Sequence, residues 1–313
     1  MKLLHTREAF GQALVELGEK NHDIVVLEAD ISTSTQTCYF AQKFPDRFYN
    51  VGVAEQNEMG IAAGLAATGK IPFVSTYSVF ASMRACEQAR TSIAYPRLNV
   101  KITVSHGGLT PGRDGATHQG VECLGIMRTI PNMTVIMPAD AVAVKKAVRA
   151  VTEYEGPVYL QFTRDPLPVI YDDTFDFEIG KSYTIKKGGD IAIIALGDMV
   201  SKALTAAEKL QSEGIAARVI DMHTIKPIDR KAIIKAAEET KGIVTVEDHN
   251  IINGLGSAVA EVIVENVPVP MERVGIRDTF AESGGYEELL TKYGLSISHI
   301  VEAVKRVFER KNL

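Results

Sequence analysis

The chain has 313 residues, of which 46% are apolar and 23% are charged, as in an ordinary globular protein. The formal net charge of −5 gives no support to binding of nucleic acid or of an anionic membrane. No stretch approaches ~20 uninterrupted apolar residues and the first residues lack a signal-peptide core, so we expect no membrane span and a cytoplasmic location. Cys38, Cys86 and Cys123 show no CxxC spacing, and we expect them to be reduced.

The first half of the chain alternates short apolar runs with longer amphipathic or Ala/Gly-rich segments. Strands are predicted at 23–30, 71–76, 99–105, 134–140 and 157–163, and helices at 59–69 and 139–154. The apolar residues of these strands are consecutive, as in parallel strands that are buried on both faces. The pattern therefore predicts an α/β fold on an open, mostly parallel sheet.

The alternation breaks at 165–190, which is rich in proline and acidic residues, and then resumes. Strands are predicted at 191–196, 215–221 and 242–248, and helices near 199–213, 229–239 and 257–265. An amphipathic helix is expected at the end of the chain. We therefore predict two three-layer α/β domains, residues 1–165 and 187–313, joined by a linker at 166–186.

Polar residues follow the predicted strands of the first domain. In open parallel sheets, ligands bind beside the carboxyl ends of the strands. The apolar run 51–53 is taken as the second strand. The residues expected at this edge are Asp30, Ser34, Glu55, Tyr77, Phe80, the segment 107–119 and Arg164.

The segment SHGGLTPGRDGATHQG, residues 105–120, is the most informative part of the sequence. It places His106, Asp114 and His118 among five glycines directly after a strand. The histidines are far apart and have no Cys or HxxxH companion, which disfavours a metal site. The GxxxxGK[ST] pattern of a phosphate loop is absent. Loops of this composition usually carry function, although a structural loop remains an alternative.

Glu55 permits two interpretations. A glutamate in the first turn of a helix is favoured by the helix dipole, and this explains most such residues. The small residues that follow, QNEMGIAAGLAATG, should pack closely and bury the carboxyl group. Burial favours the protonated form and the helix dipole favours the charged form, so Glu55 is also a candidate for proton transfer. Tyr77 and Phe80, three residues apart, fit either a core or a cofactor platform.

Five segments, in this order and spacing, resemble transketolase. They are VGVAEQNEMGIAAGLA, STYSVFASMR, SHGGLTPGRDGATHQGVE, RTIPNMTVIMPAD and RDTFAESG. The resemblance covers essentially the whole chain and implies a pyrimidine-binding domain followed by a transketolase C-terminal domain. It implies an enzyme that uses thiamine diphosphate to transfer a two-carbon ketol unit from a ketose phosphate to an aldose phosphate.

The resemblance assigns cofactor contacts to five residues. Glu55 matches the glutamate that contacts the N1′ atom of the aminopyrimidine and so promotes loss of the proton from the thiazolium C2 atom. Phe80 matches the aromatic residue that stacks on the pyrimidine. Tyr77 and Met83 match its apolar surroundings, and Asp30 matches an acid beside the cofactor.

The resemblance also implies a site for the sugar phosphate. His118 matches a histidine that transfers protons on the sugar, and Asp114 matches a carboxylate that binds a substrate hydroxyl. Arg7, Ser34, His106 and Arg164 match residues that hold the phosphate. Two arginines, a histidine and a serine suit a phosphate dianion.

Part of the family pattern is missing from this sequence. Transketolases bind Mg²⁺ and the diphosphate on a domain marked by GDG, which does not occur here. The resemblance therefore implies the C-terminal subunit of a split transketolase, with no metal ligands of its own. An N-terminal subunit would supply the Mg²⁺ and diphosphate site in an α₂β₂ assembly.

Three alternatives remain open from the sequence. One is 1-deoxyxylulose-5-phosphate synthase, which shares much of DGATHQG but tends to have arginine in place of His106. A second is the β subunit of a 2-oxo-acid dehydrogenase, which lacks RDGATHQG. A third, of another class, is a non-catalytic regulatory half-subunit, which the retention of Glu55 and the sugar-binding residues disfavours.

Overall fold

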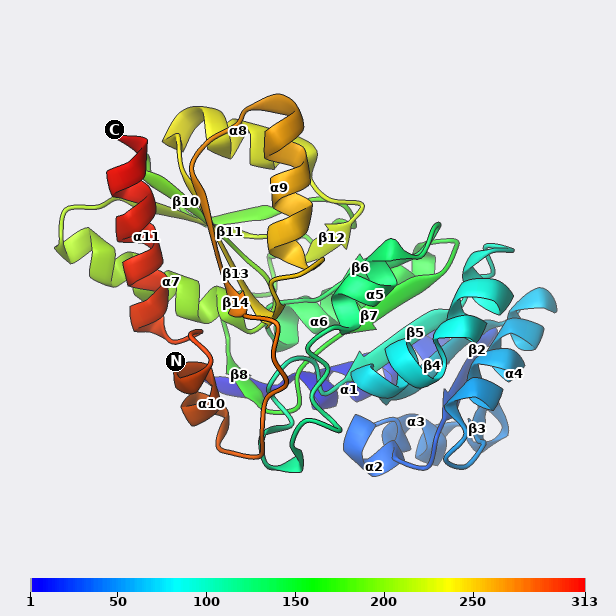
Figure 1. The fold of residues 1–313 in the computed structure, drawn as a ribbon. Helices are drawn as coiled ribbons and strands as arrows, with labels where there is room; N and C mark the ends of the chain where they lie inside the picture. Colours follow the sequence, from blue (N-terminus) through cyan, green and yellow to red (C-terminus); the bar gives the residue numbers. More distant parts are fainter. Residues whose placement is uncertain (1, 313) are drawn as a thin grey trace.

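Two mostly parallel sheets organise the computed structural model, which describes residues 2–312 (Figure 1). The α/β fold predicted from the sequence is confirmed. The first sheet has the order β12-β6-β7-β5-β4-β2-β3, and only its β12 edge is antiparallel. Its strands are β2 (Ile24–Glu28), β3 (Phe48–Asn50), β4 (Ile71–Tyr77), β5 (Lys101–Ser105), β6 (Thr134–Ile136), β7 (Val158–Gln161) and β12 (Thr224–Lys226).

Helices cover both faces of this sheet, which explains the consecutive apolar residues of its strands. In β2, Ile24 and Val26 belong to one buried cluster, whereas Val25 and Leu27 belong to the other. The first cluster includes α1 and α6, and the second includes α4, the π-helical segment η3 and α5. The bounds are α1 (Thr6–Lys20), α2 (Ser32–Thr35), α3 (Cys38–Lys43), α4 (Glu55–Ala67), η2 (Phe80–Arg84), η3 (Gln88–Ala94), α5 (Cys123–Thr129) and α6 (Ala141–Glu153).

The strand before Glu55 lies earlier than predicted. The apolar run 51–53 is not a strand, and β3 ends at Asn50. Gly52 has a φ of +74°, a left-handed conformation that interrupts an extended strand. Glu55 nevertheless begins α4, so its predicted place in the first turn of a helix is confirmed.

The second sheet has the order β14-β13-β10-β11-β9, with β9 antiparallel at its edge. Its strands are β9 (Tyr183–Lys186), β10 (Ile191–Ala195), β11 (Ala217–Asp221), β13 (Ile243–Asn250) and β14 (Met271–Ile276). Helices α7 and α11 share one buried cluster with this sheet, and α8 and α9 share the other. The helices are α7 (Met199–Ser212), α8 (Arg230–Thr240), α9 (Leu255–Asn266), α10 (Tyr286–Lys292) and α11 (Ile297–Lys311).

The segment predicted as a linker, 166–186, packs against both halves. Its β8 (Pro166–Pro168) pairs with β1 (Leu3–His5), and its β9 joins the second sheet. Tyr171 and Phe175 are buried and stack with ring centroids 3.7 Å apart. The boundaries 1–165, 166–186 and 187–313 remain a prediction.

One strand crosses between the two halves. β12 comes from the second half of the chain but pairs with β6 of the first sheet. Beside it, the Met137 N–H donates to the carbonyl of His223 at 2.8 Å, and the Lys226 ammonium donates to the carbonyl of Arg128 at 2.9 Å. The two halves are therefore joined by backbone hydrogen bonds as well as by packing.

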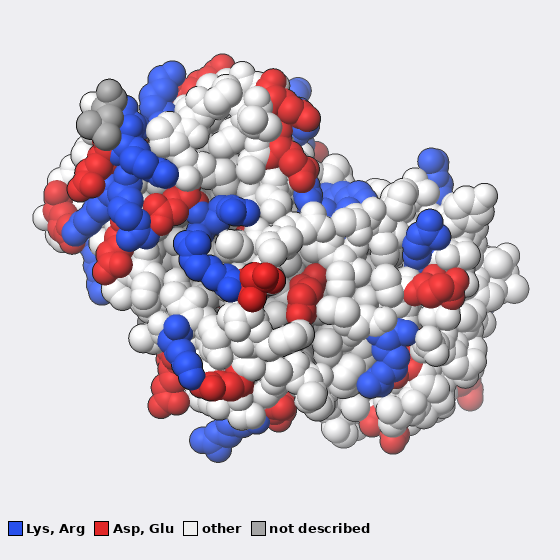
Figure 2. All heavy atoms as spheres, viewed as in Figure 1, with Lys and Arg blue, Asp and Glu red and all other residues white. Residues whose placement is uncertain are grey.

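The face of the molecule in Figure 2 carries charged side chains of both signs. On the face in Figure 2, acidic and basic side chains are interspersed over the half that carries α11, and a broad area of the other half is uncharged. None of the helices in residues 2–312 is long and apolar enough to cross a membrane.

Candidate functional site

Tyr77 lies at the centre of the polar edge of the first sheet, as the last residue of β4. Its hydroxyl donates to the Ser34 Oγ at 2.9 Å, and its ring stacks on the His106 imidazole with centroids 3.7 Å apart. Arg7 reaches the same serine, since its Nη1 donates to the Ser34 carbonyl at 2.6 Å and to Oγ at 3.3 Å. The fold thus brings together four residues that are far apart in the sequence.

Arg164 completes this cationic cluster. The Arg7 Nε donates to the Arg164 carbonyl at 3.0 Å. Burial and then the Arg164 charge lower the pKa of Arg7. Burial, followed by Arg7 and Arg164, lowers the pKa of His106 to about 3, so this imidazole is neutral at physiological pH. The cluster therefore combines two guanidinium groups with a neutral histidine.

His106 is held in a single orientation by its surroundings. Its backbone has a φ of +66°, and its carbonyl accepts from the Ser78 hydroxyl at 2.9 Å. Its Nδ1 lies 2.8 Å from the Ser105 Oγ. The other ring nitrogen, Nε2, remains for a ligand.

Phe80 and His118 extend the site beyond Tyr77. The Phe80 ring lies 5.6 Å from Tyr77 and 5.4 Å from His118, in the second case edge to face. The His118 Nδ1 lies 2.9 Å from the Thr117 Oγ1, which leaves Nε2 for other partners. The residues predicted as an aromatic platform and as a proton-transfer group are therefore neighbours.

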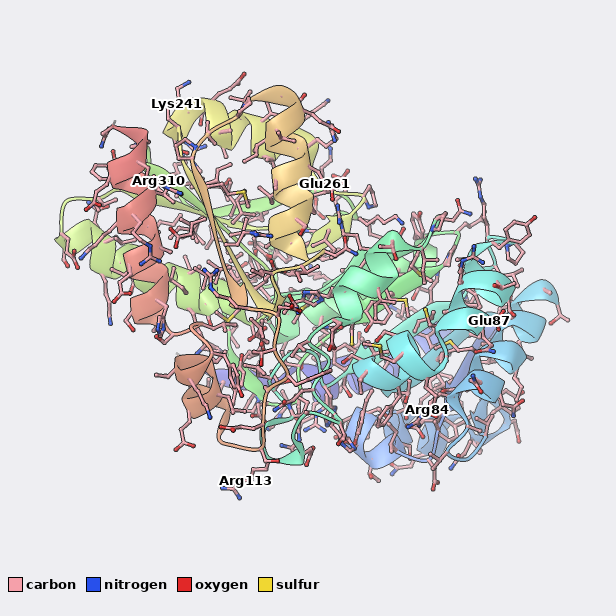
Figure 3. The ribbon with its side chains drawn as sticks, in the orientation of Figure 1. Arg84, Glu87, Arg113, Lys241, Glu261 and Arg310 are labelled. Carbon is pink, nitrogen blue, oxygen red and sulfur yellow. The ribbon has the colours of Figure 1, made fainter. Side chains whose placement is uncertain are left out.

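Glu55 is buried beside this platform, with 2% of its surface exposed. Both of its oxygens accept from the Arg84 Nη1 at 2.8 Å. The Arg84 guanidinium carbon also lies 4.4 Å from the Phe80 ring centroid, a cation–π contact. Figure 3 shows Arg84 and Glu87 on the helical stretch that follows β4. Glu55, Arg84 and Phe80 thus form one unit.

Arg84 was not among the residues predicted for the site. It lies four residues after Phe80 in STYSVFASMR, which places it close to the phenyl ring on a helical segment. This spacing could be seen in the sequence, but the contact between Arg84 and Glu55, which α4 positions, could not.

Three predicted site residues lie apart from these contacts. Asp114 is exposed in a short 3₁₀ turn, and within residues 2–312 its carboxylate bonds to no other predicted site residue. Its neighbour Arg113 marks the tip of the loop in Figure 3. Asp30 is exposed and accepts from the Asn50 amide at 2.9 Å. The Met83 side chain is 44% exposed. Their roles remain predictions.

Two further carboxyl groups lie buried near Glu55 and were not predicted. Glu28 ends β2 and Glu58 lies one helical turn after Glu55, and neither is exposed to solvent. Burial raises the pKa of Glu28 to about 7 and raises that of Glu58 well above its usual range. For Glu28, the sequence offered one signal, an acidic residue at the end of the apolar run in VVLEAD. For Glu58 it offered none, because the inner face of α4 is known only from the structure.

The loop 107–119 is anchored by the second half of the chain. The Leu109 N–H donates to the Asp248 Oδ2 at 2.8 Å, and the Gln119 amide donates to the Glu282 carbonyl at 3.1 Å. Gly108 has a φ of +60°, and a Cβ atom there would lie 2.2 Å from the same Asp248 oxygen. The second half therefore fixes the loop that carries Asp114 and His118.

The described residues contain no group of three or more His, Cys, Asp or Glu side chains placed to hold a metal ion. The predicted metal-binding role of a second subunit stays a proposal, discussed below.

Comparison with known proteins gives the family. Residues 2–169 match the pyrimidine-binding domain of transketolase, and residues 180–300 match the transketolase C-terminal domain. A putative transketolase C-terminal section from Methanocaldococcus jannaschii is 50% identical, with 97% of this chain and 95% of that protein covered. The 6-deoxy-6-sulfo-D-fructose transketolase subunit SqwH of Clostridium sp. (strain MSTE9) is 44% identical, with 98% and 95% covered.

A solved structure described as a split-gene transketolase in an inactive β4 tetramer has a TM-score of 0.93 and 51% identity to this chain. It covers 98% of this chain, and this chain covers 99% of it. The chain therefore belongs to the transketolase family, of which it carries the pyrimidine-binding domain and the C-terminal domain.

Proposed function

We propose that this chain is the C-terminal subunit of a two-polypeptide, thiamine diphosphate-dependent transketolase. With an N-terminal subunit it would transfer a two-carbon ketol unit from a ketose phosphate to an aldose phosphate. The observation that supports this most is the junction of two clusters on one sheet edge. Glu55, Phe80 and His118 suit the cofactor and the reacting sugar. The cluster beside them suits a phosphate, and its residues are Arg7, Ser34, His106 and Arg164.

The residues present fit the pyrimidine end of the cofactor. Phe80 offers a half-buried aromatic face, and the Glu55 carboxylate lies beside it. Each carboxylate oxygen has two lone pairs and accepts here from a single Arg84 nitrogen, so one oxygen retains capacity for a further N–H donor. A flat heterocycle with an N–H at its edge matches this donor and acceptor set.

Thiamine diphosphate, when bound, supplies the carbanion chemistry that breaks and forms the C–C bond. In this proposal Glu55 exchanges a proton with the N1′ atom of the aminopyrimidine. Arg84 keeps the carboxylate oriented, and burial of Glu55 excludes water from that exchange. Phe80 and Tyr77 position the ring.

The chain's own groups would also act on the sugar. His118 has a free Nε2 beside the platform and would move protons on the sugar hydroxyls. Arg7, Ser34, His106 and Arg164 would hold the phosphate, where the neutral imidazole supplies a hydrogen bond and the guanidinium groups supply charge. Asp114 would accept from a sugar hydroxyl, Asp30 would lie beside the cofactor, and Met83 would pack against it.

The diphosphate and Mg²⁺ would be held by the N-terminal subunit in an α₂β₂ assembly. One observation supports this partition: relatives that match this chain over almost their whole length are described as a C-terminal section or as a subunit. The structural relative that is described as a β4 tetramer is also described as inactive.

The test is reconstitution. The purified chain, candidate N-terminal subunits, thiamine diphosphate and Mg²⁺ are mixed and assayed with xylulose 5-phosphate and ribose 5-phosphate. Activity is expected in the mixture and in neither subunit alone, and a defined α₂β₂ mass is expected in analytical ultracentrifugation. Full activity of this chain as a homo-oligomer would refute the split enzyme. Turnover of pyruvate without turnover of ketose phosphates would refute ketol transfer.

A further inference from the structure

Glu58 is a buried carboxyl group that the proposed reaction does not use. It lies three residues after Glu55 on α4, so both side chains lie on the inner face of the helix. None of its surface is exposed. A carboxyl group in such a place must be neutralised by a cation or by a proton, because an isolated buried charge is costly.

The contacts of Glu58 supply no cation. Its Oε1 accepts from the Ser75 N–H at 3.3 Å, and its Oε2 has no hydrogen-bond partner among residues 2–312. Within those residues no Lys, Arg or His forms an ion pair with Glu58 or Glu28, whereas Arg84 pairs with Glu55. Glu55 and Glu58 thus differ in their partners. Glu55 has a cation beside it, and Glu58, which has none, keeps a proton.

The other charged groups on the elements packed around Glu58 do not neutralise it. Of the elements packed on α4, β2 contributes Glu28, η2 contributes Arg84 and η3 contributes Arg90, while β4 has no charged residue. Arg84 is bound to Glu55, and Arg90 is exposed and bonds to Thr91. Glu28 is the register partner of Ser75, so a second buried carboxyl group lies beside Glu58 and raises its pKa further.

We infer that Glu58 is a positioning residue for Glu55, a carboxylic acid that keeps its proton in the folded chain. Glu55 is then the one charged carboxyl group that the start of α4 presents to the cofactor, and Arg84 is its counter-charge. An ionised Glu58 would repel the Glu55 carboxylate and compete with it for Arg84. The functional part of this inference rests on the proposed role of Glu55.

The first test uses the free chain and needs no activity. Infrared spectra of wild type and Glu58→Gln are compared at pH 8, in the C=O stretching region of protonated carboxyl groups. Wild type should show a band that Glu58→Gln lacks, whereas Glu153→Gln, at an exposed glutamate, should retain it. An identical spectrum for wild type and Glu58→Gln would mean that Glu58 is ionised, and would overturn the inference.

The second test uses the reconstituted enzyme and its pH profile. Because glutamine replaces a neutral acid with a neutral group of similar shape, Glu58→Gln should lose less than about tenfold in kcat near pH 7, against about 10²–10⁴-fold for loss of a proton-transfer carboxyl. The acid limb of the kcat profile should stay in place, because the substitution removes no charge there. The alkaline limb should move to higher pH, because glutamine cannot ionise as Glu58 would. A shift of the acid limb to lower pH would indicate that a negative charge had been removed, which contradicts a neutral Glu58.

The two tests separate the two proposals. A lost infrared band together with an inactive wild-type reconstitution would support the neutral Glu58 and count against ketol transfer. An unchanged band together with an active enzyme would do the reverse. Glu58→Leu distinguishes acidity from packing, since it removes the acceptor for the Ser75 N–H and should lower the melting temperature more than Glu58→Gln does.

Discussion

The carboxyl edges of the two sheets carry similar residues in opposite circumstances. At the first edge, Tyr77 and Arg164 are partly exposed, and the buried Glu55 is paired with Arg84, whose side chain is half exposed. At the second edge, five acidic or imidazole side chains are buried and bound within the chain, namely Asp198, Asp221, Glu247, Asp248 and His249.

The partners at the second edge are structural. Asp221 accepts from the Tyr171 hydroxyl at 2.8 Å, and Glu247 accepts from two N–H groups at the start of α9 at 2.6 and 2.8 Å. Asp248 and His249 accept from backbone N–H groups of the first half. A buried polar residue at a strand end therefore indicates a site only where partly exposed groups lie beside it, as Arg84 and Phe80 lie beside Glu55.

The largest expected effect is that of Glu55→Gln on catalysis. The substitution should lower kcat of the reconstituted enzyme by about 10²–10⁴-fold, because glutamine cannot exchange a proton. Because glutamine keeps the shape of the side chain and can still accept from Arg84, the melting temperature should shift by less than about 4 °C. Calorimetry of the free chain checks the second point. A large fall in melting temperature with kcat retained would place Glu55 with the structural acids of the second edge.

Arg164→Ala should weaken binding of phosphorylated sugars. Loss of a charged hydrogen bond of ~1.5–3 kcal/mol corresponds to a rise in KM of about 10–100-fold, with kcat less affected. Arg113→Ala, at the exposed tip of the loop, is the matched control and should leave KM unchanged. An unaltered KM for Arg164→Ala would remove this residue from the phosphate site.

Gly108→Ala should disturb the contact between the loop and the second edge. The new Cβ atom would lie 2.2 Å from the Asp248 Oδ2, at a φ of +60°. The expected loss in unfolding free energy is ~1–3 kcal/mol, measured by urea denaturation. Gly189→Ala, which meets nothing within 4 Å, should change it by less than ~0.5 kcal/mol. Equal stabilities would show that the loop can move away from Asp248.

Asp221→Asn should alter the pH dependence of stability. Burial raises the pKa of Asp221 to about 7, against ~3.9 in an unfolded chain. Between these values the folded chain holds a proton that the unfolded chain has released. The unfolding free energy of wild type therefore falls as pH rises, by up to ~1.4 kcal/mol per unit.

Between about pH 4 and pH 7 the unfolding free energy of Asp221→Asn should fall less steeply than that of wild type by this amount, while buried acids such as Glu247 keep their own contribution. Asp176→Asn, at an exposed position, should keep the slope of wild type. Parallel curves for wild type and Asp221→Asn would mean that the carboxyl group is ionised inside the fold.

The smallest effect concerns the partner of Asp221. Tyr171→Phe removes the hydroxyl that donates to it at 2.8 Å and should cost ~1 kcal/mol in unfolding free energy, with activity unchanged. Tyr95→Phe, at an 82% exposed tyrosine, should cost nothing measurable in the same urea titration. A loss of activity in Tyr171→Phe would mean that a buried contact of the second edge also affects catalysis, which contradicts its purely structural role.

Much of the fold and part of the site followed from local patterns. The consecutive apolar runs identified the buried parallel strands, and the strand-end rule gathered Ser34, Tyr77 and Arg164, which the structure places near Arg7. The family resemblance added roles that periodicity cannot supply. The role of Arg84 as the partner of Glu55 could not be predicted, because it depends on how α4 and η2 meet.

Two other features escaped prediction for similar reasons. Glu58 reads as an ordinary helical glutamate until the burial of α4 is known. The segment Thr224–Lys226 is short and directly precedes Pro227, so the sequence does not indicate a strand there, and its partner β6 lies about ninety positions earlier in the sequence. Pairing over such a distance is decided by tertiary packing.

The crossing strand β12 has a consequence for dissection of this protein. A fragment that ends near residue 169 would contain the whole pyrimidine-binding segment but would leave β6 as an uncovered edge. Uncovered edge strands recruit other chains and promote aggregation. A separable half of this enzyme would therefore have to carry residues 224–226, or a designed strand in their place, to remain monodisperse.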